Sequence, residues 1–281
     1  MTPRRGRLVV VATPIGNLGD LSPRAMDALR VADVIACEDT RRTRRLLSAT
    51  GISAPRLMAV HGENERERVE AIVSILAKGH CVALVSDAGS PGVSDPGRVV
   101  VAAVAEAGYL VEVVPGPSAV VTALSASGLP AERFVFEGFL PRKGPERRAR
   151  LAAIAADERT TVAYEAPSRV AATLSDLRDA CGPGRLAVVA RELTKLHEEL
   201  WRGSLDEAVR WAGETKPRGE FVVVIAGRPT SERPAIDDDA IIAALADARA
   251  AGASTRAAAS EVAAALEVPR NRVYKLAVRP T

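Results

Sequence analysis

The chain has 281 residues, 47% of them hydrophobic, which is enough for two domains with buried cores and a small appendage. No apolar run approaches the roughly 18 residues of a membrane helix, and no signal-peptide pattern is present, so we expect a cytoplasmic protein without membrane contact. Three scattered cysteines and three scattered histidines argue against a disulfide framework and a metal site, and the net charge of +3 favours no class of partner.

The first part of the chain alternates short β-branched runs with helix-like stretches. Ser22 and Pro23 carry the cap and first-turn signals of a helix, while Asp95 and Gly108 mark the two ends of another. Strands that alternate with helices predict an open, largely parallel sheet in an N-terminal α/β domain over 1–116. The predicted strands are 8–12, 34–37, 57–60, 82–86 and 110–114, and the other predicted helices are 40–49 and 65–78.

The middle of the chain gives a second set of elements with shorter connections. Ser118 can cap a short helix, and 197–201 is a further candidate strand. Because short connections favour antiparallel pairing, we predict a second α/β domain over 117–228 with more antiparallel character. Its predicted strands are 134–136, 160–164, 186–190 and 221–225, and its predicted helices are 145–156, 167–180 and 204–212.

A small helical module is predicted over 236–281, after a Pro-rich polar linker at 227–235. One helix begins near Asp237, a second covers 255–266, and Pro269 opens a third. Three short helices are typical of a helix-turn-helix unit, and equally of a packing or dimerisation appendage. The residues alone leave both interpretations open.

Gly- and Pro-rich loops follow several of the predicted strands, at 13–20, 86–97, 115–119 and 164–169. In open parallel sheets, ligands bind beyond the carboxyl ends of the strands. Rigid loops of small residues expose backbone groups without bulky side chains, which suits an adenosine-type ligand. Any one such loop is also typical of an ordinary surface turn, but several at strand ends favour a ligand site. Neither a phosphate-binding G-x-x-x-x-G-K-[ST] loop nor a G-x-G-x-x-G loop occurs, which disfavours ordinary nucleotide and dinucleotide sites.

Basic side chains gather in two short segments of the chain. Local basic patches indicate a phosphate-rich partner, although solvated helix faces give the same pattern. The candidate substrate-binding residues are Arg41, Arg42, Arg44 and Arg45 in the first segment and Lys143, Arg147 and Arg148 in the second.

Several segments resemble, in order, the motifs of the tetrapyrrole methylase superfamily. They include V-V-A-T-P-I-G-N-L-G-D-L-S-P-R-A at 10–25, S-D-A-G-S-P-G-V-S-D-P-G at 86–97 and V-P-G-P-S-A at 114–119. The run A-D-V-I-A-C-E-D-T-R at 32–41 is similar to the branch that methylates ribosomal RNA. Y-E-A-P-S-R at 164–169 and A-R-E-L-T-K-L-H-E-E at 190–199 continue the match in order. T-P-I-G-N-L and A-G-S-P stand where tetrapyrrole-making members have G-x-G-P-G-D and G-G-D-P, which also favours the RNA branch. The resemblance runs nearly continuously through Gly227.

The resemblance implies the α/β, two-domain fold of class III S-adenosylmethionine methyltransferases, with the methyl donor between the domains and usually a homodimer. It implies 2′-O-methylation of a cytidine ribose in small-subunit (16S) ribosomal RNA, so the partner is that RNA or the 30S subunit. The candidate basic residues would then contact RNA phosphates. By position, the donor contacts would be Pro14, Ile15, Asp87, Ala88, Gly89, Ser90, Val93, Ser118, Ala119, Glu165 and Leu193.

No catalytic residue is assigned from the sequence. A ribose hydroxyl is a weak nucleophile, so a base or a polarising cation should assist its attack. Two other functions stay open, namely methylation of a corrinoid or porphyrin precursor and a non-catalytic role in ribosome assembly. The candidates for the base or the cation, at or near strand ends, are Asp39, His61, Glu63, Glu165, Arg191, Glu192 and Lys195.

Overall fold

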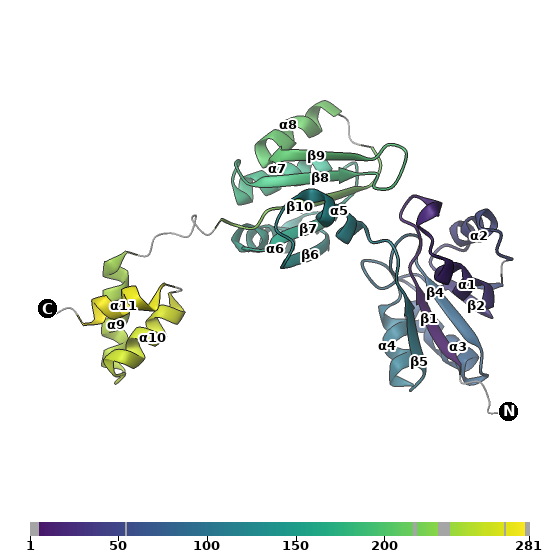
Figure 1. Ribbon diagram of the computed structural model, residues 1–281, viewed down its shortest axis with the longest axis horizontal. Coiled ribbons are helices and arrows are strands. Elements are labelled where there is room, and N and C mark those ends of the chain that lie inside the picture. Colours follow the sequence, from purple (N-terminus) through teal and green to yellow (C-terminus); the bar gives the residue numbers. More distant parts are fainter. Residues whose placement is uncertain (1–5, 54, 216–217, 230–236, 267, 279–281) are drawn as a thin grey trace. The chain divides into compact units, whose positions relative to one another are not determined.

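The computed structural model describes residues 6–53, 55–215, 218–229, 237–266 and 268–278. The chain forms two compact units, Met1–Arg228 and Pro229–Thr281, and the first unit contains two β-sheets (Figure 1). Most of the predicted linker, 230–235, lies outside the described residues. Among the described helices, none is both long and apolar enough to cross a membrane.

The first sheet is entirely parallel, as predicted, with strand order β3-β2-β4-β1-β5. Each predicted strand lies within one residue of an observed one. The strands are β1 (Arg7–Val11), β2 (Val34–Cys37), β3 (Arg56–Ala59), β4 (Cys81–Val85) and β5 (Leu110–Val114), and the helices are α1 (Pro23–Val31), α2 (Thr40–Ala49), α3 (Glu65–Ala77) and α4 (Arg98–Glu106), with a 3₁₀ turn η1 (Leu18–Asp20).

Helices cover both faces of this sheet. Alternate residues of β1 point to opposite faces, so Val9 and Val11 pack with α1 and α2 while Leu8 and Val10 pack with α3 and α4. Because both faces are buried, the strands read as continuous apolar runs. The carboxyl ends of the strands are left to the loops that form the candidate site.

Helix α4 begins at Arg98, three residues later than Asp95, where its start was predicted. The buried carboxylate of Glu65 on α3 accepts hydrogen bonds from the backbone N–H groups of Gly97, Val99 and Val100, at 3.0, 2.7 and 3.1 Å. These N–H groups have no partner within the helix itself. A distant acid therefore caps the helix, and Asp95 is left in the preceding loop.

The second sheet has strand order β6-β7-β10-β8-β9 and is mostly antiparallel, as predicted. Only β6 and β7 run parallel, with a register shift between Phe136 and Gly138. The last strand in the sequence, β10, lies at the centre of the sheet. The strands are β6 (Phe134–Phe139), β7 (Thr160–Glu165), β8 (Leu186–Arg191), β9 (Glu199–Ser204) and β10 (Phe221–Ile225).

The prediction of a strand at 197–201 was wrong in its bounds. Arg191 pairs with Glu199 at the end of the β8–β9 ladder, so the seven residues between them form the connecting loop. Glu192 and Thr194 in this loop adopt positive φ angles of 49° and 67°, which no strand accommodates. At its other end, β9 continues beyond the predicted residue 201 to Ser204, which pairs with Leu186.

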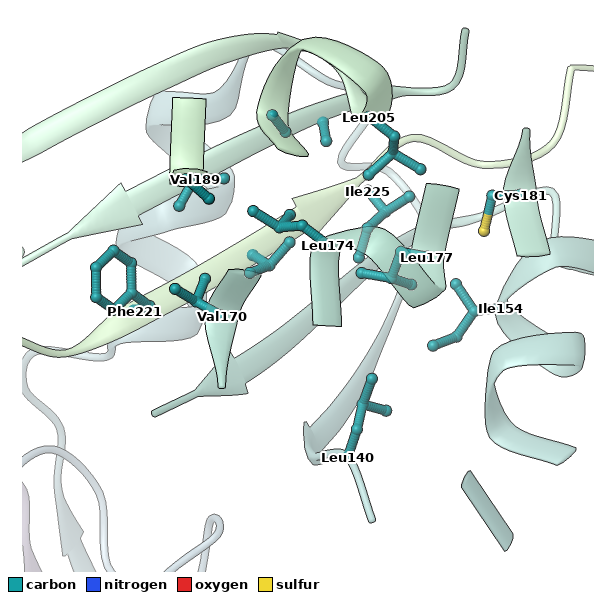
Figure 2. Close-up of a cluster of buried hydrophobic side chains, with 14 of the residues drawn as sticks. Leu140, Ile154, Val170, Leu174, Leu177, Cys181, Val189, Leu205, Phe221 and Ile225 are labelled. Atoms are coloured by element: carbon teal, nitrogen blue, oxygen red, sulfur yellow. The ribbon is translucent and has the colours of Figure 1, made fainter. Parts of the chain in front are cut away.

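The two faces of the second sheet have different cores. One face packs against α6, α7 and α8 through Val189, Phe221, Leu174 and Leu205, among others (Figure 2). The other face packs against α5, and Ile15 from the first loop of the chain joins that core. The four helices of this sheet are α5 (Ala119–Ser127), α6 (Gly144–Ala156), α7 (Val170–Cys181) and α8 (Leu205–Thr215).

The second compact unit is a three-helix module with a core of its own. Asp237 and Ser254 cap the first two helices through their side chains. Ile241, Leu245 and Val273 meet in its core together with several alanines. The helices, α9 (Asp238–Ala250), α10 (Thr255–Ala265) and α11 (Arg270–Ala277), agree with the predicted ones.

Candidate functional site

The loops after β1, β4 and β5 are joined by backbone hydrogen bonds. Thr13 and Gly89 form an isolated bridge in which each N–H donates to the other carbonyl, at 2.9 and 3.0 Å. The hydroxyl of Thr13 donates to the carbonyl of Ser86 at 3.2 Å, and the N–H of Ala12 donates to the carbonyl of Val114 at 3.1 Å. The predicted glycine-rich loops thus form one connected surface at the carboxyl ends of the strands.

A cavity of about 380 Å³ lies over this surface, within the size range of small-molecule sites. Both sheets contribute to its walls. The first sheet and its loops supply Ile15, Ala88, Gly89, Ser90, Val93, Ser94, Asp95, Ser118 and Ala119, and the second sheet and its loops supply Phe139, Tyr164, Glu165, Ala166, Pro167, Leu193, Glu220, Phe221 and Val222.

Glycine is required at two positions of these loops. Gly89 has φ of +75°, a conformation that side chains rarely adopt. A Cβ atom on Gly16 would lie 2.4 Å from Cγ of Lys195 and 2.8 Å from Oγ1 of Thr194. The first loop therefore touches the loop after β8, and this contact holds Ile15 and Leu193 on the wall of the same cavity.

An aromatic group forms another part of the wall. The ring of Tyr164 meets those of Phe136 and Phe139 edge-on, with centroid distances of 5.0 and 5.6 Å. Burial, and then the negative charge of Asp95, raise the pKa of the Tyr164 phenol. The phenol therefore stays protonated at neutral pH.

Glu165 is a fully paired carboxylate in the cavity wall. It is 2% exposed and accepts hydrogen bonds from the N–H of Ala166 at 2.9 Å and the hydroxyl of Thr173 at 2.6 Å. The guanidinium of Arg169 lies 3.3 Å away. A buried carboxylate with three such partners is held in position.

Asp95, in the wall of the same cavity, has an environment opposite to that of Glu165. Burial, and then the nearby carboxylates of Glu38 and Asp87, raise its pKa to about 6, against a hydrogen bond from Ser86. The pKa of Glu38 is also raised, first by burial and then by Asp87. Asp87 is held by the N–H of Asp39 at 3.0 Å and by Arg42 at 3.3 Å. The cavity therefore contains a carboxyl group that changes charge near neutral pH.

The tetrapyrrole (corrin/porphyrin) methylase family model matches residues 7–209. The chain belongs to this family. The resemblance stated from the motifs is thereby confirmed, as is the two-domain α/β fold that it implied.

Curated relatives match almost the whole chain. A Synechocystis protein is 44% identical over 97% of this chain and 98% of its own length, and an Escherichia coli O157:H7 protein is 42% identical over 98% and 95%. A Mycobacterium bovis protein is 48% identical over 95% and 92%. All three are named ribosomal RNA small subunit methyltransferase I.

Solved structures of the tetrapyrrole methylase family have the same fold. A cobalt precorrin-4 methyltransferase is similar with a TM-score of 0.60 and 15% identity, over 79% of this chain and 95% of that one. A uroporphyrin-III C-methyltransferase from Thermus thermophilus, complexed with S-adenosylhomocysteine, is similar with a TM-score of 0.55 and 22% identity, over 79% and 97%.

Nine of the eleven residues that the tetrapyrrole methylase motifs indicated for the donor line the cavity. Pro14 follows the bridged Thr13 and lies outside the lining, and Asp87 points its carboxylate toward α2. Asp95 and Tyr164 line the cavity but were not among the predicted residues, although both stand in motifs quoted for the resemblance. Their position in those motifs was the only signal available.

The candidates for a base or a polarising cation lie mostly outside the cavity lining. Asp39 caps α2 by accepting from the N–H of Arg41, and Arg191 pairs with Glu199. The carboxylate of Glu192 holds the ammonium of Lys195 at 2.9 Å. Of the seven candidates, only Glu165 lines the cavity, and neither His61 nor Glu63 does. Among the described residues, no group of three or more His, Cys, Asp or Glu side chains could hold a metal ion.

The first basic segment lies on α2, which contacts Asp87 of the loop after β4. Arg41 and Arg42 are exposed and pair with Asp39 and Asp87, at 3.2 and 3.3 Å. Arg44 and Arg45 are exposed on the same helix. The helix therefore presents cations next to the loop that carries Asp87.

The second basic segment divides into two kinds of residue. Lys143 and Arg148 are exposed, but Arg147 is buried. The guanidinium of Arg147 donates to the carbonyl of Pro141 at 2.8 Å and pairs with Asp176 at 2.7 Å. Because its donors are used inside the fold, Arg147 has none directed at an RNA phosphate, and we remove it from the predicted contacts.

Proposed function

We propose that this protein transfers the methyl group of S-adenosylmethionine to the ribose 2′-hydroxyl of a cytidine in small-subunit ribosomal RNA. The observation that carries the proposal is the cavity at the strand ends, in a chain whose full-length relatives are named small-subunit ribosomal RNA methyltransferases. We also propose a cytoplasmic location, where the ribosome is assembled, and a homodimeric state, in keeping with the family.

The cavity fits the methyl donor by its chemistry. The loop 88–90 offers backbone groups and small side chains to a nucleoside, as Gly89 allows a close approach. The donor carries positive charge on its sulfonium and its amine, and the carboxyl group of Glu165 lies in the wall. When bound, the donor supplies an electrophilic methyl carbon. We therefore propose the nine predicted residues in the wall as its contacts.

We propose that RNA phosphates bind the exposed cations of α2, together with Lys143 and Arg148. Phosphate contacts fix the register of a nucleic acid on a protein, and here they would bring a ribose to the cavity mouth. Scarce aromatic residues, 3% of the chain, disfavour extensive base stacking. The target cytidine would have to leave its stack to reach the donor.

A tetrapyrrole substrate is the nearest alternative, since the structural neighbours act on such macrocycles. Their identity to this chain is 15% and 22%, which shows a shared fold and not a shared substrate. The relatives at 42–48% identity carry RNA methyltransferase names. The exposed arginines of α2 also suit a polyanion better than a small macrocycle.

The deciding experiment is methyl transfer in vitro. The purified protein is incubated with donor labelled in its methyl group and with 30S subunits from a strain that lacks this gene. Uroporphyrinogen and large-subunit RNA serve as alternative acceptors. We expect label in small-subunit RNA, at a cytidine that becomes resistant to alkaline cleavage on its 3′ side. Label in the porphyrinogen alone would establish the alternative, and donor binding without transfer to any acceptor would contradict both.

A further inference from the structure

We propose that Asp95 is the general base that accepts the proton of the substrate hydroxyl, an inference that rests on the proposed function. Four titratable side chains line the cavity, namely Asp95, Tyr164, Glu165 and Glu220. A base must reach the reacting atoms and must have a lone pair that is not already committed. Each of the four can be tested against these two conditions.

Three of the four side chains do not meet both conditions for a base. The carboxylate of Glu165 is buried with Arg169 and two hydrogen-bond donors, so protonating it would break an ion pair. Glu220 has a side chain 74% exposed and pairs with Lys195 at 2.9 Å. The phenol of Tyr164 is protonated at neutral pH because its pKa is raised. None of these groups is an unpaired carboxylate inside the cavity.

Asp95 meets both conditions, because the hydrogen bond from Ser86 occupies only part of the accepting capacity of its carboxylate. It lies in the wall of the cavity, and among the described residues no cation pairs with its carboxylate. The acidic groups that face it are Glu38 at the end of β2, Asp87 after β4 and the phenol of Tyr164 on β7. Arg42 is directed to Asp87 and not to Asp95. Surrounding acids make this carboxylate a better proton acceptor than an isolated one.

The backbone holds Asp95 in place. Gly92 donates to the carbonyl of Pro96 at 3.0 Å, closing the loop around Asp95, and Glu65 holds the N–H of Gly97. Ser94 has φ of 60°, a strained conformation for a residue with a side chain. Its hydroxyl lies within 3.2 Å of where a Cβ would stand on Gly138 of β6. Asp95 is thus fixed where the donor loop meets the second sheet.

The step balances with this one residue. The hydroxyl oxygen forms a bond to the methyl carbon, and the carbon–sulfur bond of the donor breaks with its electron pair staying on sulfur. The hydroxyl proton passes to the Asp95 carboxylate, which becomes neutral, while the sulfonium becomes a neutral thioether. The proton then leaves to solvent, and the carboxylate is restored for the next turnover.

The test compares Asp95→Asn with the wild-type protein in single-turnover transfer to 30S subunits at saturating donor. We expect a rate at pH 7.5 lowered by about 10²- to 10⁴-fold, the usual contribution of a positioned base. The wild-type rate should rise with pH and level off above about 6, where the pKa of Asp95 lies. The variant should lack this rise. The dissociation constant of the donor, measured by calorimetry, should stay within threefold.

Two further variants keep the test decisive. Asp95→Ala with added formate should recover part of the lost rate, because formate supplies a mobile carboxylate. Asp27→Asn removes an exposed carboxylate from α1 and should change neither rate nor pH profile.

A rate within fivefold of wild type in Asp95→Asn, or an unchanged pH profile, would overturn the proposal. So would a loss of donor affinity equal to the loss of rate, since Asp95 would then be a donor contact. Each of these results leaves wild-type transfer to small-subunit RNA intact, so the proposed function stands or fails on the wild-type measurement alone.

Discussion

Two carboxylates in one cavity show how the surroundings of a residue set its chemistry. Glu165 is buried beside Arg169 and accepts a hydrogen bond from Thr173, so its carboxyl oxygens are occupied. Burial, and then the nearby carboxylates of Glu38 and Asp87, favour the neutral form of Asp95. Environments that separate two acids in this way are typical of sites that need one fixed charge and one proton acceptor.

The raised pKa of Asp95 predicts a dependence of stability on pH. Its pKa is raised from 3.8 to about 6 in the folded chain, so its contribution to stability is full below pH 3.8 and is lost as pH rises through 6. The amide in Asp95→Asn does not titrate, so the variant does not lose this stability as pH rises. We expect the free energy of unfolding of the variant, relative to wild type, to increase by about 1–2 kcal/mol between pH 4.5 and 7.5.

Urea denaturation of both proteins at the two pH values measures this change. Asp27→Asn, which removes an exposed acid, should show no such trend. A relative stability that is constant or falls with pH would mean that Asp95 is not in an acidic environment.

At the level of single residues, the sequence indicated half of the cavity lining but not Asp95. Asp95 stands in the quoted S-D-P-G run, where it could equally be a turn residue or a helix cap. Its character depends on Glu38 and Asp87, which come from two other strand ends and meet it only in the folded sheet. Such neighbours are separated by many residues in the sequence, so no local pattern reports them.

At the level of loops and helices, the contact between the first loop and the loop after β8 depends on one missing side chain. Gly16→Ala would place a Cβ 2.4 Å from Cγ of Lys195 and 3.1 Å from the carbonyl of Leu193. The loops must then separate, which moves Ile15 and Leu193 in the cavity wall. We expect donor affinity to fall about tenfold, equal to about 1.4 kcal/mol.

Calorimetry with the donor measures this loss. The matched control is Gly62→Ala, where the added Cβ would meet no atom within 4 Å. Equal donor affinities for the two variants would show that the loop contact does not shape the cavity.

Helix α2 is the element on which the RNA proposal can be tested. Arg44→Glu with Arg45→Glu reverses two exposed charges, and we expect KM for 30S subunits to rise at least tenfold while donor affinity stays unchanged. The salt dependence of KM should also become weaker, since fewer counterions are released on binding. Steady-state kinetics at two salt concentrations measure both effects.

The control makes the same change of charge on another helix. Arg66→Glu with Arg68→Glu lies on exposed positions of α3. If both double variants raise KM equally, the effect comes from net charge and not from a binding face on α2.

The bounds of helices and strands were predicted well where burial of the side chains alone determines them. Strands of the first sheet are buried on both faces, and apolar runs such as 82–86 show them directly. The start of α4 was missed because its cap is Glu65, more than thirty residues earlier in the chain. The bounds of β9 were missed because two residues of the preceding loop adopt positive φ angles.

For the whole molecule, the division into two compact units predicts which part binds the donor. All residues that line the cavity lie between Ile15 and Val222, within the first unit. The helical module has its own core, with Ile241 and Val273 fully buried. We expect a chain that ends after Arg228 to bind the donor within threefold of the full chain, as measured by calorimetry. A tenfold loss would mean that the module completes the donor site.

The pairing of the two sheets lay beyond what residue patterns alone could predict. The alternation of elements predicted a parallel sheet followed by a mostly antiparallel one. That Ile15 of the first loop enters the core of the second sheet could not be seen, because an apolar residue in a loop gives no indication of its partner. Only the resemblance to tetrapyrrole methylases implied a donor site between the two halves.

The central place of β10 has a consequence for synthesis of the chain. Until this strand emerges from the ribosome, β7 and β8 lack their shared neighbour and leave open edges that invite aggregation. Phe221 and Val222, which belong to the same strand, are also missing from the cavity wall until then. If this cavity binds the donor, as we propose, a nascent chain acquires donor affinity only late in folding, because β10 ends about four fifths of the way along the chain.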